Sequence, residues 1–239
     1  MTLERAAEAP VAVLLPTRNG AGTLGEVLEA LRRQTCRCDF DVVAIDTDST
    51  DGTRELLERH GVRTRQIQRD EFGHGRTRND LAEMVPRARY LVYLSQDATP
   101  VGPWLEALLD AVTTGPEVAG AFSRQAPRPG ANPLVARRML EEWPQVGGAD
   151  RIEKRLAPVC GAAIDHELAH FANTSSCVRR DVWSEIPFPD VPFAEDVAWA
   201  CLVLAAGYRL VYEPRSVVLH SHGGSAWRQL RENIAHGRA

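Results

Sequence analysis

Residues 90–97, YLVYLSQD, form an apolar run that ends abruptly in polar side chains. The Val, Leu and Tyr residues predict a buried β-strand, and the run finishes on Ser95, Gln96 and Asp97. A carboxylate at the end of a buried strand is costly unless it meets water, a cation or a ligand. In open α/β sheets, ligands bind at the carboxyl ends of the strands. This segment therefore predicts a ligand site at one edge of a sheet.

Two earlier segments follow the same pattern, because the apolar runs at 11–16 and 41–46 also end in polar residues and precede helical periodicity. We expect Asp51 to cap the helix after the second run and Gly61 to end it. Further strands are predicted at 62–68, 118–123, 208–214 and 217–222, a polar loop at 70–79, and helices at 23–33, 54–61, 104–109, 133–143 and 195–206. This alternation predicts an α/β fold with a doubly wound, mostly parallel (mixed) central sheet flanked by helices.

Composition and charge narrow the class of protein. A chain of 239 residues with 44% hydrophobic and 25% charged residues is typical of a soluble globular protein, and its net charge of −4 argues against binding nucleic acid. The N-terminus lacks the apolar stretch of a signal peptide, and no run is long enough to span a membrane. We therefore expect a cytoplasmic protein, with peripheral membrane contact left open. We expect one domain, 1–239, with a soft division near residue 126 at the turn-rich segment APRPGANP.

The common phosphate-binding motifs are absent: the sequence contains neither a Walker-type glycine loop nor a G-x-G-x-x-G after the first strand. Five other segments are informative in combination and in order: VAVLLPTRNGAGTLGEVLEALRRQT, VVAIDTDSTDGT, FGHGRTRND, YLVYLSQDATP and PFAEDVAWACLVLAAGYRLVYEP. Together they resemble family-two glycosyltransferases of the GT-A fold over residues 10–222. The segments EFGHGRTRN and LSQDATP are most similar to the rhamnosyltransferase branch of that family.

The resemblance implies a reaction and its partners. The family transfers a sugar from a nucleotide-diphosphate donor with inversion at the anomeric carbon, usually with Mg²⁺ or Mn²⁺. The branch implies dTDP-rhamnose as the donor and a growing glycan or lipid-linked glycan as the acceptor. Residues 10–125 then correspond to the nucleotide-sugar-binding half, and residues 126–239 to the acceptor-binding and catalytic half.

The resemblance also implies a donor site. The matching positions are Pro16, Thr17 and Arg18 along the nucleoside, Asp46 at the base, Arg78 and Asn79 near the diphosphate, and Gln96 on the donor side. For Asp46 the alternative is an ordinary turn residue at a strand end. Gly20 stands where many members of the family carry an acid, so a ribose contact through that side chain is absent here.

Asp97 matches the last position of the family's Asp-x-Asp metal motif, which reads Ser95-Gln96-Asp97 here and lacks the first acid. A divalent cation would neutralise the charge on the departing diphosphate, and hard cations prefer oxygen ligands. The resemblance offers His220 as a further ligand and His222 as a weaker candidate. A lone histidine at a strand end is more often structural, which remains the alternative for both.

Glu195 and Asp196 match the family's paired acids at the start of a helix. An inverting transfer needs one base to take the proton of the acceptor hydroxyl, and we assign that role to Asp196. Glu195 is expected to hold the acceptor. The alternative is that both acids favour the helix N-terminus through its dipole.

Two other functions stay open on the sequence. A non-catalytic nucleotide-sugar-binding or scaffold protein on a degenerate GT-A fold would explain Ser95 in place of an acid. A nucleotidyltransferase would need a basic glycine-rich loop after the first strand, and TRNGAGT does not provide one. A glycosidase is disfavoured because hydrolysis needs two facing carboxylates.

Overall fold

The computed structural model describes residues 9–137, 139, 148–156 and 167–221. Within them, nine strands form one mixed sheet in the order β3-β2-β1-β4-β8-β6-β9-β5, and β7 pairs with β9. The strands are β1 (Val11–Thr17), β2 (Phe40–Thr47), β3 (Arg63–Ile67), β4 (Tyr90–Leu94), β5 (Thr99–Val101), β6 (Val118–Ala126), β7 (Ile152–Arg155), β8 (Ser175–Arg179) and β9 (Arg209–Leu219). The helices are α1 (Ala21–Arg32), α2 (Thr53–Arg59), the 3-10 helix η1 (Arg69–Glu71), α3 (His74–Glu83), α4 (Trp104–Val112), α5 (Pro133–Arg137), α7 (Arg180–Glu185) and α8 (Glu195–Ala205).

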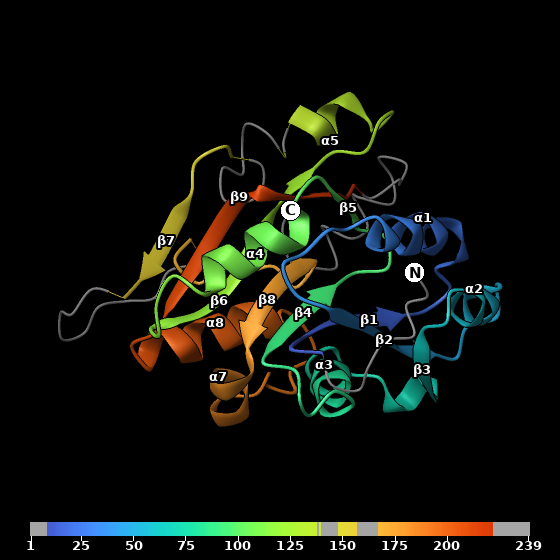
Figure 1. Ribbon diagram of the computed structural model, residues 1–239, viewed down its shortest axis with the longest axis horizontal. Helices are drawn as coiled ribbons and strands as arrows, with labels where there is room; N and C mark the ends of the chain where they lie inside the picture. Colours follow the sequence, from blue (N-terminus) through green and yellow to red (C-terminus); the bar gives the residue numbers. More distant parts are fainter. Residues whose placement is uncertain (1–8, 138, 140–147, 157–166, 222–239) are drawn as a thin grey trace.

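The sheet lies between two layers of helices, with α1, α2 and α4 on one face and α3, α7 and α8 on the other (Figure 1). Successive side chains of β1 point to opposite faces of the sheet, so this strand packs against both layers of helices. Val13 and Leu15 pack into the core on the α1 and α4 side, whereas Ala12 and Leu14 pack into the core on the α3 side. The predicted α/β fold with a mixed central sheet is thereby confirmed. None of the helices in the described residues is long and apolar enough to cross a membrane.

The topology brings distant segments to one edge of the sheet. Strands β3, β2, β1 and β4 are parallel, so their carboxyl ends lie together. Strand β8 runs antiparallel to β4 and pairs Ser175 with Leu94, which places the start of β8 at this edge. Strand β6 is antiparallel to β8 and parallel to β9, so the end of β9 lies there too. The predicted site residues that follow β4 and β9 therefore share an edge.

The prediction of a polar loop at 70–79 was wrong for its second half, because α3 begins at His74. Its first turn packs tightly against a distant loop: a Cβ on Gly75 would lie 2.1 Å from the carbonyl oxygen of Pro189. That close approach depends on tertiary structure, so the local sequence does not reveal it.

Helix α2 begins one residue later than the cap prediction implies. Its N-cap is Gly52, with a φ of 92°, whereas Asp51 was expected there. The Asp51 carboxylate still accepts the backbone N–H of Thr53 at 3.1 Å, so it satisfies one free donor of the first turn. The predicted stop at Gly61 is confirmed by its φ of 69° just beyond the helix.

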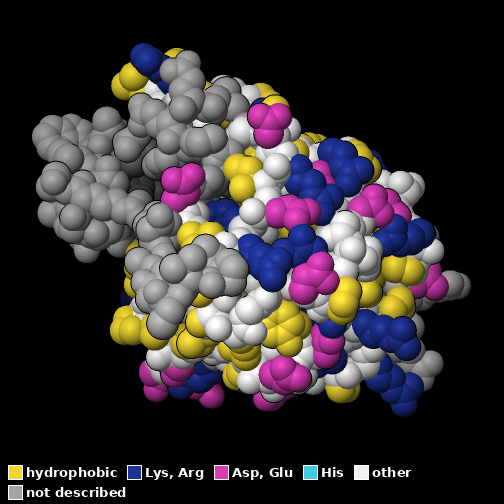
Figure 2. Space-filling model, turned by 90° about the vertical axis from the view of Figure 1, so that its left-hand side faces the viewer, with side chains coloured by type: hydrophobic (Ala, Val, Ile, Leu, Met, Phe, Trp, Pro, Cys, Tyr) yellow, Lys and Arg dark blue, Asp and Glu magenta, His cyan; other side chains and the backbone are white. Residues whose placement is uncertain are grey.

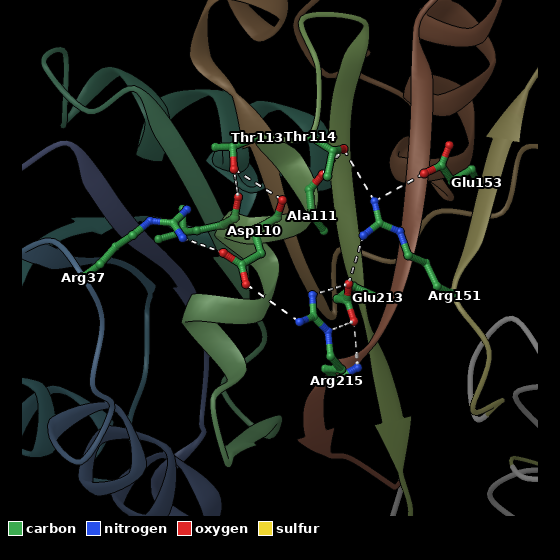
Figure 3. Close-up of polar contacts among 10 residues, drawn as sticks. Arg37, Asp110, Ala111, Thr113, Thr114, Arg151, Glu153, Glu213 and Arg215 are labelled. Atoms are coloured by element: carbon green, nitrogen blue, oxygen red, sulfur yellow. Dashed lines mark hydrogen bonds and ion pairs between the residues drawn. The ribbon is translucent and has the colours of Figure 1, made fainter.

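Strand β9 is continuous where two strands were predicted, and β5 and β7 were not predicted. A bulge absorbs Pro214, because Ser123 of β6 pairs with Glu213 and the next residue of β6 pairs with Val217. Figure 3 shows the buried Glu213 carboxylate between the guanidinium groups of Arg215 and Arg151. It also accepts the Arg215 backbone N–H at 3.0 Å, so the bulge keeps a hydrogen-bond partner.

The same charge network continues to α4, where Asp110 pairs with Arg37 and Arg215 (Figure 3). Basic and acidic side chains are also interspersed across the side of the molecule that lies to the left in Figure 1 (Figure 2). Opposite charges therefore lie near one another on that side.

Candidate active site

Asp97 and His220 meet at the edge where β4 and β9 end. The Asp97 Oδ2 lies 3.5 Å from the His220 Nε2, and the Asp97 side chain is 36% exposed. The other ring nitrogen, Nδ1, lies 2.9 Å from Gln125 Oε1. With that oxygen as the acceptor, Nδ1 carries the proton and Nε2 presents a lone pair to the carboxylate. A carboxylate and an imidazole lone pair that face each other in this way suit a cation.

Arg128 holds the segment around Asp97 in place. Its Nη2 donates to the Asp97 carbonyl oxygen and to Thr99 Oγ1, both at 2.8 Å, and its Nη1 pairs with Glu26 of α1 at 2.7 Å. The backbone N–H of Arg128 donates to Ser221 Oγ at 3.4 Å, next to His220. Arg128 was not predicted as a site residue, because its partners are distant along the chain and the turn-rich segment around it carries no motif.

The predicted donor residues Thr17 and Asp46 are in contact. Thr17 Oγ1 donates to Asp46 Oδ2 at 3.1 Å, and the backbone N–H and hydroxyl of Ser49 donate to the same carboxylate. Asp46 is fully buried and Arg54 Nε lies 4.0 Å from its Oδ1. These contacts fix the turn after β2, which was the alternative role considered for Asp46. Its contact with a nucleotide base stays a prediction.

Gln96 joins the first and fourth strands. Its Oε1 accepts the Arg18 N–H at 2.9 Å and its Nε2 donates to the Arg18 carbonyl at 2.8 Å, as a neighbouring backbone would. Thr23 Oγ1 donates to the Gln96 carbonyl at 3.2 Å. The side chain fits because residue 20 is glycine: a Cβ on Gly20 would lie 2.2 Å from Gln96 Oε1. Gln96 thus shapes the loop after β1, while the Arg18 side chain is exposed.

A buried ion pair connects α3 with α8. Arg78 Nη1 lies 3.0 Å from Glu195 Oε1, and the two side chains are 10% and 6% exposed. Asn173 Nδ2 donates to the same Glu195 oxygen at 3.2 Å, and Ser176 Oγ donates to Asn173 Oδ1 at 2.8 Å. Arg78 also donates to the His74 carbonyl. The Arg78 Nε is buried and has no hydrogen-bond partner among the described residues.

Asp196 lies beside this pair and close to the end of β4. Its Oδ2 accepts the Asn173 N–H at 3.2 Å and its Oδ1 accepts the Val197 N–H at 2.9 Å. The carbonyl of the next residue, Thr174, accepts the Ser95 N–H at 2.9 Å. Residues 173 and 174 are therefore hydrogen-bonded both to the start of α8 and to the residue that follows β4. Burial raises the pKa of Asp196, and the neighbouring Glu195 raises it further, against the hydrogen bonds and Arg78, which lower it. A carboxylate with a raised pKa accepts a proton more readily.

The remaining predicted residues lie apart from these clusters. Asn79 uses its side chain to hold the loop before α8: Nδ2 donates to the Phe188 carbonyl, and Oδ1 accepts from Phe188 N–H and Trp183 Nε1. Pro16 is half-buried near the end of β1. Their contacts with a donor stay predictions. His222 lies outside the described residues.

Backbone conformation marks the same region. Among the described residues, the non-glycine residues with positive φ are Asn19, Asp48 and Ala194, at 43°, 49° and 56°. Each lies within three residues of a predicted site residue. Asn and Asp tolerate this conformation, but alanine at the N-cap of α8 is strained by about 1–2 kcal/mol. Strain of this kind is found at functional sites when the surroundings enforce it.

Comparison with known families identifies the chain. The sequence profile described as Glycosyl transferase family 2 matches residues 12–185, well over half of the chain. The chain belongs to this family. It is 28% identical over 215 residues to the O-antigen chain rhamnosyltransferase RfbN of Salmonella typhimurium, covering 89% of this chain and 66% of that protein. It is also 28% identical to the O-antigen chain rhamnosyltransferase WbaN of Salmonella anatum, covering 88% and 65%. The chain therefore spans just under two thirds of each relative, and the predicted likeness to rhamnosyltransferases is confirmed.

Solved structures confirm the predicted GT-A fold. A mannosyltransferase from Pyrobaculum calidifontis, in complex with GDP-Man and Mn²⁺, superposes with a TM-score of 0.65 at 20% identity, covering 95% of this chain and 61% of that one. TarS 1-349 of S. aureus in complex with UDP has a TM-score of 0.61 at 19% identity, covering 87% and 59%. At these identities the likeness shows the fold alone. No group of three or more His, Cys, Asp or Glu side chains within the described ranges is arranged to hold a metal ion.

Proposed function

We propose that this protein is an inverting glycosyltransferase that moves a sugar from a nucleotide-diphosphate donor to a glycan or lipid-linked acceptor. The observation that carries the proposal is the Asp97–His220 pair at the carboxyl edge of the sheet, in a chain of glycosyl transferase family 2. The names of the two Salmonella relatives favour rhamnose as the sugar, and hence dTDP-rhamnose as the donor.

Asp97 and His220 suit a divalent cation. A partly exposed carboxylate oxygen and an imidazole Nε2 converge to 3.5 Å, and both are accepted ligands of Mn²⁺-type metals. These two residues would hold the cation together with oxygens of the donor diphosphate, and the bound cation would neutralise negative charge on the leaving group. Gln125 would keep the His220 ring oriented, and Arg128 would keep the Asp97 backbone in place.

Asp196 would act as the general base. Inversion needs a single carboxylate that takes the proton of the acceptor hydroxyl while its oxygen attacks the anomeric carbon. The raised pKa of Asp196 makes it a stronger base than an exposed aspartate, and two backbone N–H groups fix its direction. Glu195 would border the acceptor, although Arg78 and Asn173 already engage one of its oxygens.

The test combines binding with turnover. Thermal unfolding is measured with UDP, dTDP, GDP and CMP, with and without Mn²⁺, for wild type, Asp97→Ala and Asp196→Asn. We expect one diphosphate to stabilise the wild type in a Mn²⁺-dependent manner, and dTDP if the donor is dTDP-rhamnose. Asp97→Ala should lose this effect. Asp196→Asn should keep it and lose sugar transfer to a lipid-linked acceptor.

Asp39→Ala is the matched control, because Asp39 is an exposed aspartate before β2, at the opposite edge of the sheet. It should behave as wild type. Metal-dependent stabilisation that survives in Asp97→Ala would remove the metal assignment, and undiminished turnover in Asp196→Asn would remove the base. If a diphosphate stabilises the wild type but no sugar transfer is detected, a non-catalytic nucleotide-sugar-binding or scaffold function would be favoured instead.

A further inference from the structure

A cavity of about 510 Å³ lies at the edge of the sheet opposite Asp97. Three segments line it: the turn before β4, the loop after α4, and the junction of β8 with α7. The charged residues of its lining are Arg87, Arg89, Arg179, Arg180 and Asp181. Because β4 has five residues and a strand rises about 3.3 Å per residue, the cavity and Asp97 are separated by roughly 17 Å. The proposed donor site does not account for it.

The charge of the lining is unusual for this chain. It contains four guanidinium groups and a single carboxylate, whereas the whole chain carries a net charge of −4. In the network around Glu213, by contrast, each arginine faces an acid. Like charges gathered in a concave site raise the local concentration of anions. The lining therefore selects a negatively charged ligand.

Two of the arginines are held rigidly by the fold. Arg180 donates through Nε to the Ala88 carbonyl and through Nη2 to the carbonyls of Ala82 and Val85, at the end of α3. Its Nη1 donates to no atom of the residues that the structure describes. Arg179 spans the cavity, donating to the Pro116 carbonyl on one wall and pairing with Asp181 on the other. Guanidinium groups fixed in this way lose little freedom when an anion binds.

The exposed arginines complete the rim. Arg87 and Arg89 are exposed on the turn between α3 and β4. The backbone of Arg89 is fixed, because its N–H donates to the Pro10 carbonyl at 2.8 Å and its carbonyl accepts the Arg180 N–H at 2.9 Å. Its side chain makes no hydrogen bond or ion pair with the described residues. We propose that this cavity binds a phosphate-bearing anion, with Arg89 and Arg180 as its principal ligands.

Phosphate suits the site better than a single carboxylate. Guanidinium groups bind phosphate oxygens in pairs of parallel hydrogen bonds, and a phosphomonoester or diphosphate offers enough oxygens and charge for several arginines at once. The ligand could come from solution or from a lipid headgroup, and the shared chemistry is the phosphate dianion.

The experiment titrates inorganic pyrophosphate into the full chain by calorimetry in metal-free buffer. We expect binding by wild type, a loss of affinity of about tenfold or more in Arg89→Ala, and a larger loss in Arg87→Ala/Arg89→Ala. Arg59→Ala is the matched control, since Arg59 is an exposed arginine in the last turn of α2, away from the cavity. It should bind as wild type. Asp97→Ala should also bind as wild type, because the proposed donor site is at the other edge.

A flotation assay identifies the source of the ligand. Vesicles of phosphatidic acid in phosphatidylcholine are compared with vesicles of phosphatidylcholine alone. Arg89-dependent binding to the first kind points to a lipid headgroup, and pyrophosphate binding without any vesicle binding points to a soluble phosphate. The proposal is overturned if wild type binds neither probe, if Arg59→Ala loses as much affinity as Arg89→Ala, or if Asp97→Ala abolishes binding.

Discussion

Substitution of Arg78 should lower the free energy of unfolding, in addition to any effect that it has on donor binding. In Arg78→Met the methionine keeps much of the side-chain volume but removes the partner of the buried Glu195 carboxylate. Breaking a buried ion pair by removing one partner costs about 3–5 kcal/mol, since the other charge stays buried without compensation. Asn173 still donates to Glu195 Oε1, so we expect a loss in the free energy of unfolding near the lower end, about 3 kcal/mol.

A double-mutant cycle isolates the pair. Urea unfolding followed by circular dichroism gives the free energy of unfolding for wild type, Arg78→Met, Glu195→Gln and the double variant. The double variant leaves no uncompensated charge, so its loss should be smaller than the sum of the single losses by at least about 1.5 kcal/mol. Arg65→Met is the matched control: Arg65 pairs with Asp80 across the surface, and its loss should stay below about 1 kcal/mol.

The result also distinguishes two roles for Arg78. A residue that serves only to bind the donor would leave the free energy of unfolding unchanged on substitution and weaken nucleotide binding alone. A loss below about 1 kcal/mol in Arg78→Met, or additive single losses, would refute the argument that the Arg78–Glu195 pair holds α3 against α8.

Two further predictions concern the loop after β1 and the proposed base. Gly20→Ala should displace the Gln96 side chain and break its two hydrogen bonds with Arg18, costing about 1–3 kcal/mol in urea unfolding. In a Gln96→Ala background the same change should cost almost nothing, and an equal cost in both backgrounds would contradict the packing argument. The raised pKa of Asp196 means that its contribution to stability is fully present below the ordinary aspartate pKa, about 4, and is lost as the pH rises through its folded pKa. The stability of Asp196→Asn relative to wild type should therefore increase from about pH 4 upward in urea midpoints, and a flat difference would show that Asp196 titrates normally.

The sequence was sufficient to predict the half of the sheet that positions Asp97. Strands β1, β2 and β4 are apolar runs that end in polar residues, and that pattern survives without any knowledge of tertiary contacts. Strands β5 and β7 escaped prediction because they have three and four residues and no apolar run. Strand β9 continues past Pro214 through a bulge at which the buried Glu213 carboxylate accepts the Arg215 N–H, and the local sequence shows neither that burial nor the register shift.

The candidate site was predictable in its residue types and less so in its contacts. Asp97 and His220 were expected as ligands of one metal, and the structure brings them to 3.5 Å. The role of Arg128 was not foreseen, because it depends on Glu26, on the Asp97 carbonyl and on Thr99, which come together only in the folded chain. Likewise, burial is the main cause that raises the pKa of Asp196, and that burial cannot be read from residues 195–196 alone.

The contact between Gly20 and Gln96 gives a physical reason for the glycine at position 20, which departs from the family pattern. Gly20 stands where many members carry an acid, and Gln96 is the middle residue of the Ser95-Gln96-Asp97 segment. Any side chain at position 20 would occupy the space of the Gln96 amide, as the 2.2 Å and 2.6 Å approaches of a Cβ show. The Gln96 amide pairs with both polar groups of the Arg18 backbone, which a carboxylate at position 96 could not do, since a carboxylate accepts but does not donate. Gly20 and Gln96 therefore form one structural unit that joins the loop after β1 to the segment carrying Asp97, and the glycine is required because the Gln96 amide fills the space beside it.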